Sequence, residues 1–99
     1  MGAEQVEFLE EASAEFKAAF LWYLERNSKV ASEFADSLTR AIQAIAEAPQ
    51  RWPIHLGGTR KFVMRRFPFV IVYREAASAV RIVAVAHAKR KPGYWTRRL

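Results

Sequence analysis

The spacing of apolar residues changes once along the chain, at Pro49, and this change limits the possible fold more than any other feature. From about residue 10 to residue 48, apolar side chains recur every three or four positions, the spacing of one helix face. After an irregular stretch that contains Pro53, Gly57 and Gly58, runs of Val, Ile, Phe and Tyr follow too closely for a helix to fit between them. The pattern predicts an α+β fold, with the helices first and most of the sheet afterwards.

Two helices are predicted before Pro49, from Glu10 to Arg26 and from Ser28 to about Ala48. Ser28 is expected to cap the second helix by accepting a backbone N–H, and Pro49 to end it. Because the connection is so short, the helices must form an antiparallel hairpin. The side chains expected to face inward are Ala12, Phe16, Ala19, Phe20, Tyr23 and Leu24 in the first helix and Ala31, Phe34, Leu38, Ala41, Ile42 and Ile45 in the second.

Four strands are predicted. Apolar and polar residues alternate from Glu4 to Leu9, which indicates a short amino-terminal edge strand. The segments Phe62–Met64, Phe69–Tyr73 and Ala79–Ala86 are expected to form an antiparallel meander, so that the hairpin packs on an antiparallel sheet. The second of these is apolar at every position, so we expect it to be central and covered on both faces.

Strict alternation in the last strand places its two polar residues on one surface. Val80, Ile82, Ala84 and Ala86 would then face the helical hairpin. Arg81 and His87 would lie on the opposite face, away from the helices.

Charge divides at the same point as periodicity. The net charge is +6, but residues 1–48 carry nine acidic and four basic residues, whereas residues 49–99 carry one acidic and twelve basic residues. Such asymmetry favours an anionic partner, either nucleic acid or an acidic protein segment. The alternative is a solvated basic face that only aids solubility.

The length of 99 residues predicts a single domain over residues 1–99, since two separate cores would each be too small. The absence of cysteine excludes a disulfide scaffold and thiolate metal sites, and fits a reducing cytoplasm. No apolar run approaches the about 18 residues of a membrane span. We therefore expect a soluble, cytoplasmic protein.

Motifs for cofactor and metal chemistry are missing from the sequence. The only histidines, His55 and His87, are far apart, and no acidic cluster accompanies them in the basic half. Neither a phosphate-binding nor a dinucleotide-binding glycine motif occurs, and no serine sits in a glycine-rich elbow. We expect no metal and no cofactor, so any catalysis would be metal-independent.

A basic sheet surface is the candidate target site. Its expected cations and aromatic hydroxyl are Arg60, Arg65, Arg66, Arg74, Arg81, His87, Arg90 and Tyr94. Arginines there could hold phosphates, and His87 has a suitable intrinsic pKa for proton transfer. Glu75 is the only acid expected near this surface. The alternative is that these are ordinary surface arginines and a hydrogen-bonded histidine.

Two further features suggest a protein partner. Leu21 and Trp22 fall far from the inward face of the first helix, so we expect them to be exposed and to mark an interface. Near the carboxy terminus, Tyr94 and Trp95 follow several cations. This segment could stack and form ion pairs with a partner, or it could fold back to close the core.

The order strand, helical hairpin, meander resembles the RelE/ParE superfamily of bacterial toxins over nearly the whole chain. The segments that carry the resemblance are Trp22-Tyr23, Ala48-Pro49, Trp52-Pro53, Arg60, Phe67-Pro68-Phe69-Val-Ile-Val-Tyr73-Arg74, Ala86-His87 and Arg90-Lys91-Pro92-Gly93-Tyr94-Trp95. The resemblance implies the toxin of a type II toxin–antitoxin (plasmid stabilisation) pair. An antitoxin would wrap the hairpin and sheet, contact Leu21 and Trp22, and form a hetero-oligomer with the toxin.

The superfamily divides by target. The Phe-Pro-Phe entry to the central strand and the His-to-Trp ending are similar to ParE-like chains, which implies a toxin that inhibits DNA gyrase without cutting nucleic acid. The alternative is a RelE-like, ribosome-dependent messenger-RNA endoribonuclease, for which Arg60, Arg81, Arg90 and Tyr94 are the candidate catalytic residues. A third reading is a non-toxic basic nucleic-acid-binding module, whose affinity would fall steeply with salt.

Overall fold

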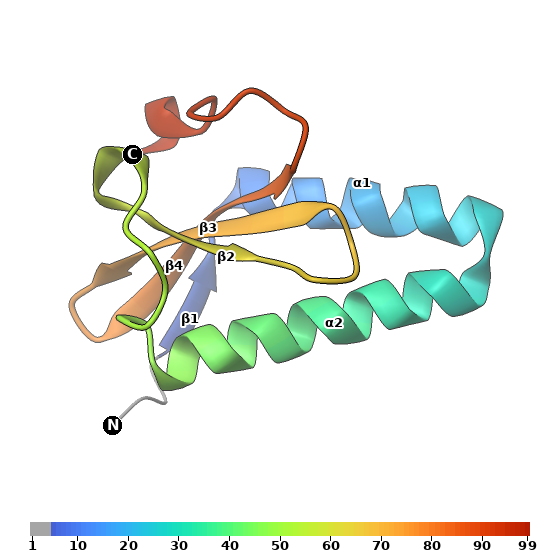
Figure 1. Cartoon of the computed structure of the whole chain (residues 1–99), viewed down its shortest axis with the longest axis horizontal. Coiled ribbons are helices and arrows are strands. Elements are labelled where there is room, and N and C mark those ends of the chain that lie inside the picture. Colours follow the sequence, from blue (N-terminus) through green and yellow to red (C-terminus); the bar gives the residue numbers. More distant parts are fainter. Residues whose placement is uncertain (1–4) are drawn as a thin grey trace.

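A four-stranded sheet with a helical hairpin packed on one face forms the framework of the protein (Figure 1). The computed structural model describes residues 5–99, so Glu4 of the predicted edge strand lies outside the described residues. The elements in chain order are β1 (Gln5–Phe8), α1 (Glu10–Arg26), α2 (Ser28–Glu47), the 3₁₀ turn η1 (Leu56–Gly58), β2 (Arg60–Val63), β3 (Phe69–Ala76), β4 (Ala79–His87) and the 3₁₀ turn η2 (Thr96–Arg98). The predicted α+β class and element order are confirmed.

The strands follow the order β1-β4-β3-β2 across the sheet. The β2-β3-β4 meander is antiparallel, as predicted, while β1 pairs in parallel with the first half of β4. The sheet as a whole is therefore mixed, and the prediction of an antiparallel sheet was wrong for β1. β3 is central and covered on both faces, since Ile71 and Tyr73 pack in the helix-side core and Val72 packs in a second cluster on the other face.

The helix boundaries match the prediction closely, but the cap between the helices is a different residue. Asn27 Oδ1 accepts hydrogen bonds from the backbone N–H groups of Lys29 and Val30 at 3.0 and 3.2 Å. Asn27 adopts an extended conformation with φ −165°, whereas Ser28 is already the first helical residue. The prediction of a Ser28 cap was wrong because Asn27 alone connects the two helices, and it therefore occupies the cap position.

Aromatic rings connect the hairpin to the sheet. Phe34 of α2 is fully buried, and its ring lies 5.1–5.8 Å, centroid to centroid, from the rings of Phe16, Tyr23, Phe67 and Phe69. These four residues come from α1, the β2–β3 loop and β3. This cluster fixes the angle between the hairpin and the sheet through dispersion and apolar burial.

A β-bulge in β4 overturns the predicted alternation. Val72 pairs with Ala84 but Tyr73 pairs with Ile82, so Val83 is an extra residue in β4. Beyond the bulge the faces exchange: Val85 joins the helix-side core, and Ala84 joins the second cluster. The expectation that Ala84 and Ala86 face the hairpin was therefore wrong, as was the expectation that Arg81 and His87 share a face.

The carboxy-terminal segment folds back over the face of the sheet opposite the helices (Figure 1). Trp95 is 3% exposed and packs with Val72, Val83, Ala84 and Ala86. The carboxy-terminal aromatic segment was expected either to contact a partner or to close the core. Trp95 closes the core. In the described part of the chain, no helix has the length and apolarity required to span a bilayer.

Candidate protein-interaction site

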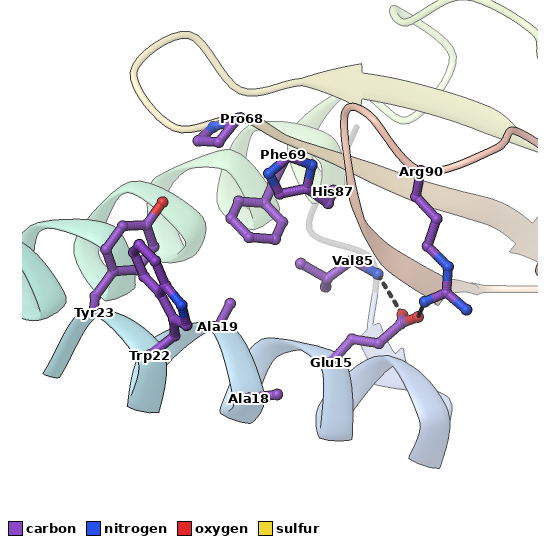
Figure 2. Close-up of a pocket in the computed structure, with 10 residues that line it drawn as sticks. All are labelled: Glu15, Ala18, Ala19, Trp22, Tyr23, Pro68, Phe69, Val85, His87 and Arg90. Atoms are coloured by element: carbon purple, nitrogen blue, oxygen red, sulfur yellow. Dashed lines mark hydrogen bonds and ion pairs between the residues drawn. The ribbon is translucent and has the colours of Figure 1, made fainter. Parts of the chain in front are cut away.

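A groove of about 500 Å³ lies between α1 and the end of β4 (Figure 2). Trp22 and Tyr23 stand at one end of the groove and Glu15 and Arg90 at the other. The remaining lining residues are Ala18, Ala19, Pro68, Phe69, Val85 and His87. Small residues on α1 keep the groove open, so it offers an apolar floor with charged groups at one end.

The predicted exposure of Leu21 and Trp22 on the outer face of α1 is confirmed. Leu21 is 44% exposed and Trp22 is 52% exposed. The guanidinium of Arg26 lies 3.7 Å from the Trp22 ring centroid and donates to the Trp22 carbonyl at 2.7 Å. Leu24, predicted to face inward, is 42% exposed instead, because α1 presents Ala19 and Tyr23 to the core at this end.

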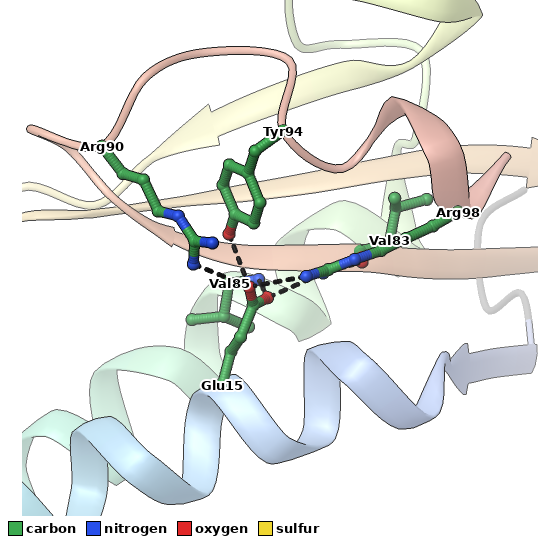
Figure 3. A network of polar contacts seen from close by, with 6 residues as sticks. All are labelled: Glu15, Val83, Val85, Arg90, Tyr94 and Arg98. Atoms are coloured by element: carbon green, nitrogen blue, oxygen red, sulfur yellow. Dashed lines mark hydrogen bonds and ion pairs between the residues drawn. The ribbon is translucent and has the colours of Figure 1, made fainter.

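One carboxylate, that of Glu15, joins α1 to β4 and to the carboxy-terminal segment (Figure 3). Its oxygens accept hydrogen bonds from Val85 N–H at 3.0 Å, Tyr94 O–H at 2.6 Å and the Arg98 guanidinium at 3.0 Å. Arg90 adds an ion pair at 3.7 Å and stacks 3.6 Å from the Tyr94 ring centroid. Arg98 also donates to the Val83 carbonyl at 3.0 Å.

These contacts shift the ionisation of the groups involved. Burial alone would raise the pKa of Glu15, but hydrogen bonds from Arg98, Tyr94 and the Val85 amide lower it overall. Burial and the hydrogen bond to Glu15 raise the pKa of Tyr94 to about 12. Tyr94 is therefore neutral at physiological pH, and its hydroxyl group donates a hydrogen bond to the Glu15 carboxylate.

The predicted target-binding residues do not form one surface. Arg74 and Arg81 are direct cross-strand neighbours on the sheet face away from the helices, and Arg81 pairs with Glu7 at 3.2 Å. Arg60 pairs in register with Tyr73, on the helix-side face, and donates to the carbonyls of Gln50 and Trp52 at 3.3 and 2.8 Å. Arg60 thus fastens the loop that follows α2.

The other predicted residues lie at two further places. Arg65 and Arg66 occupy the β2–β3 loop beside α2, where Arg66 pairs with Glu33 at 2.5 Å. His87 lines the α1–β4 groove with Arg90; its ring packs against Phe69, and its Nδ1 accepts from the Lys89 backbone N–H at 3.1 Å. The bulge at Val83 is what separates His87 from Arg81, which strict alternation had placed together.

Metal ligands do not gather anywhere in residues 5–99: no three His, Cys, Asp or Glu side chains come together there in a way that could hold an ion. The carboxylate nearest to the candidate site is Glu15, whose oxygens are already occupied by cations and N–H or O–H donors.

The sequence matches the family model of the ParE toxin of the type II toxin–antitoxin system parDE over residues 6–92. The chain belongs to the ParE toxin family. It is thus a toxin of the type II toxin–antitoxin class, and the predicted membership of the RelE/ParE superfamily is confirmed. No curated protein matches the sequence.

Solved structures of related toxins share the fold of this ParE-family chain. A chain of the chromosomal ParDE system from P. aeruginosa aligns with a TM-score of 0.77 and 14% identity, covering 88% of this chain and 98% of that one. The Mycobacterium tuberculosis RelBE2 toxin–antitoxin complex gives 0.59 and 21%, covering 90% and 97%. The isolated E. coli RelE toxin gives 0.62 and 20%, covering 98% and 100%.

Glu15 is the residue that sequence reasoning missed in this ParE-family toxin. The sequence indicated Glu75 as the sole acid near the sheet surface, yet Glu15 reaches the edge of β4. A signal was available: Glu15 lies three residues after Ala12 and four before Ala19, on the buried stripe of α1. A carboxylate at such a position requires a partner, and the arginine-rich carboxy terminus provides one.

Proposed function

We propose that this ParE-family toxin inhibits DNA gyrase without cutting nucleic acid, and that a cognate antitoxin neutralises it by direct binding. The observation that supports a non-nucleolytic action is the separation of the candidate catalytic residues. Arg60 holds a loop on the helix side and Arg81 lies on the opposite face, so neither joins Arg90, which stacks on Tyr94 beside Glu15. Because gyrase acts in the cytoplasm, the proposal places the toxin there.

A metal-free ribonuclease needs cations and a proton carrier at a single point of the substrate. Tyr94 is poorly suited to carry protons, because its pKa is raised to about 12 by burial and by the hydrogen bond to Glu15. His87 lines the α1–β4 groove with Arg90, on the face of the sheet opposite to that of Arg81. These placements favour gyrase inhibition over the RelE-like alternative.

We assign the contact with gyrase to the sheet face that carries Arg74 and Arg81. Both side chains project from the same face as neighbours across β3 and β4, which concentrates positive charge there. Glu7 pairs with Arg81 on the surface, where such a pair contributes little stability and can exchange for a pair with a partner carboxylate. The double variant Arg74→Ala/Arg81→Ala should therefore remain folded and lose toxicity.

Induction of the chain in bacteria tests this proposal. Growth arrest with a DNA-damage response and gyrase-linked DNA breaks is the expected result, and the Arg74→Ala/Arg81→Ala variant should grow normally. Arrest with messenger RNA cut at fixed codon positions would support the ribonuclease instead. Harmless expression of the wild-type chain would favour the simple nucleic-acid-binding module.

We assign antitoxin binding to Leu21, Trp22 and the adjoining α1–β4 groove. Exposed apolar side chains beside an apolar groove are typical of protein interfaces. Two of the structural neighbours are described as a ParDE system and a RelBE2 toxin–antitoxin complex, which supports a hetero-oligomer of toxin and antitoxin.

The binding assignment is tested by calorimetry with the protein encoded by the gene that adjoins this one. Leu21→Glu/Trp22→Glu should weaken binding strongly, because it places two charges in an apolar contact. The control Ser32→Glu/Gln43→Glu adds the same charge at exposed positions of α2 and should bind like the wild type. Equal affinities for all three proteins would contradict this assignment.

A further inference from the structure

The α1–β4 groove has a size at which small organic molecules bind to proteins. Its volume of about 500 Å³ lies within the range of about 300–1,000 Å³ that is typical of ligand pockets. Between its two ends the lining is apolar, with Ala18 and Ala19 of α1 on one side and Phe69 of β3 and Val85 of β4 on the other (Figure 2). The groove therefore favours a ligand with an apolar body.

Two aromatic pairs line this groove. The rings of Trp22 and Tyr23 meet edge to face, 5.2 Å between centroids. The rings of Phe69 and His87 do the same at 5.3 Å. A ligand with an aromatic ring can make edge-to-face or offset contacts with these side chains, which an aliphatic chain cannot make. The apolar body of the ligand is therefore expected to be aromatic.

Arg90 supplies a positive charge at the end of the groove opposite Trp22. The charge of Glu15 is balanced by Arg98, whose guanidinium donates to both carboxylate oxygens at 3.0 Å. Arg90 lies farther from Glu15, at 3.7 Å, and its side chain is 55% exposed. Stacking at 3.6 Å from the Tyr94 ring centroid holds the Arg90 guanidinium in place before a ligand arrives. One anionic group can pair with Arg90, whereas Glu15 would repel a dianion.

The edge of β4 adds a backbone donor to the groove. Val85 N–H points away from β3 and donates to Glu15 at 3.0 Å. His87 follows two residues later in the same regular pairing with β3, so its N–H points the same way. Because both residues line the groove, the His87 N–H can donate to an oxygen atom of a ligand there.

From these observations we infer that the α1–β4 groove binds a small aromatic monocarboxylate. Its ring would lie between α1 and Phe69, and its carboxylate would pair with Arg90. The inference goes beyond the proposed function, because it assigns a small-molecule ligand to the toxin itself and requires neither gyrase nor an antitoxin.

Isothermal titration calorimetry of the full chain with 2-naphthylacetate tests this inference. The ligand should bind with one-to-one stoichiometry, and Arg90→Gln should weaken binding by at least about tenfold, since it removes a charge-assisted hydrogen bond. The control Arg40→Gln removes the same charge from an exposed position of α2 and should bind like the wild type. No saturable binding to the wild type in the millimolar range, or equal losses in the two variants, would overturn the inference.

A leucine in the groove tests where the ligand lies. Ala18→Leu should weaken binding by at least about tenfold, because the larger side chain occupies the space of the ligand ring. Ala14→Leu makes the same substitution at an exposed position of α1 outside the groove and should leave binding unchanged. Both positions are exposed, so both variants should fold, which thermal unfolding checks. Wild-type affinity in Ala18→Leu would contradict the assigned position.

Two related ligands test the chemistry that the groove selects. The neutral 2-naphthylacetamide keeps the ring but loses the charge, and should bind at least about tenfold more weakly than 2-naphthylacetate. Octanoate keeps the charge but lacks the ring, and should bind several-fold more weakly. Equal affinities for the three ligands would overturn the inference.

Nuclear magnetic resonance of the wild-type chain locates the ligand without any variant. The indole N–H of Trp22 and the backbone N–H groups of Val85 and His87 should shift during titration with 2-naphthylacetate. The indole N–H groups of Trp52 and Trp95 lie outside the groove and should not shift. Shifts at Trp52 or Trp95 without shifts at Trp22 and His87 would overturn the inference.

Discussion

Glu15 shows how one side chain can complete an incomplete sheet. β1 pairs only with Ala79–Ile82, so the second half of β4 has no neighbouring strand on that side in the described structure. Glu15 accepts from the Val85 amide, and Arg98 donates to the Val83 carbonyl. These two side chains replace the missing strand as hydrogen-bond partners, and they hold the carboxy-terminal segment in place (Figure 3).

Replacing Glu15 with glutamine should destabilise the protein and reduce its sensitivity to acid. The loss at pH 7 should be about 1–3 kcal/mol, since hydrogen bonds to a charged group are removed. In the folded protein the pKa of Glu15 lies below its ordinary value of 4.5, so its stabilisation is present above pH 4.5 and is lost as the pH falls through the lowered value. Urea unfolding measured at pH 7 and at steps below pH 4.5 checks both effects.

Glu47→Gln provides the matched control for this measurement. Glu47 is exposed at the end of α2, so its replacement should change stability by less than that of Glu15. If the two variants unfolded at the same urea concentration at every pH, the stabilising role of the Glu15 contacts would be contradicted.

Ala77 carries local backbone strain in the turn between β3 and β4. Its φ is +53°, in the left-handed region that an L-residue adopts at a cost of about 1–2 kcal/mol. Ala77→Gly should relieve this strain, but glycine also increases the entropy of the unfolded chain, which offsets part of the gain. We expect the free energy of unfolding to rise by up to about 1 kcal/mol. Thermal unfolding measures the change. The control Ser78→Gly should not stabilise, and a loss of stability in Ala77→Gly would contradict the expectation.

At the scale of elements, the sequence was sufficient to locate the strands but not to assign all of their faces. The β-branched and aromatic runs located β3 and β4 correctly because they reflect burial, which depends on local composition. The bulge at Val83 depends on the register between two strands. Val83 is apolar like its neighbours, and no Gly or Pro indicates a bulge there. The sequence therefore predicted an unbroken alternation of faces from Val80 to His87.

The connection between α1 and α2 gives a prediction that separates two adjacent residues. Asn27→Ala should destabilise the protein by about 1 kcal/mol, because Asn27 Oδ1 satisfies two backbone N–H groups at the start of α2. Ser28→Ala should have a much smaller effect, since Ser28 is within the helix. Chemical unfolding of both variants checks the difference. A larger loss for Ser28→Ala would contradict the observed cap.

At the scale of the whole molecule, the fold and the exposed face of α1 could be predicted, whereas the distribution of the arginines could not. Helical periodicity is a local property, so it correctly left Leu21 and Trp22 outside the core. The place of an arginine depends on which distant group it meets, as Arg60 meets the loop after α2 and Arg98 meets Glu15. The excess of positive charge was visible in the sequence, but its division among four places was not.

The two proposed protein interactions of the toxin lie at separate places. Arg74 and Arg81 lie on the sheet face away from the helices, Leu21 and Trp22 lie on α1 beside the α1–β4 groove, and Arg65 lies in the β2–β3 loop beside α2. Variants at Arg74 and Arg81 should leave antitoxin binding unchanged, and variants at Leu21 and Trp22 should leave the action on gyrase unchanged, because the two sites share no residue.

The most direct test of the central claim, that this toxin acts on gyrase through the sheet face of Arg74 and Arg81, is DNA supercoiling by purified gyrase. The wild-type toxin should inhibit supercoiling and trap cleaved DNA. Arg74→Ala/Arg81→Ala should do neither, while unfolding at nearly the same temperature as the wild type. Unchanged supercoiling with the wild-type toxin, together with cleavage of messenger RNA on ribosomes, would contradict the account.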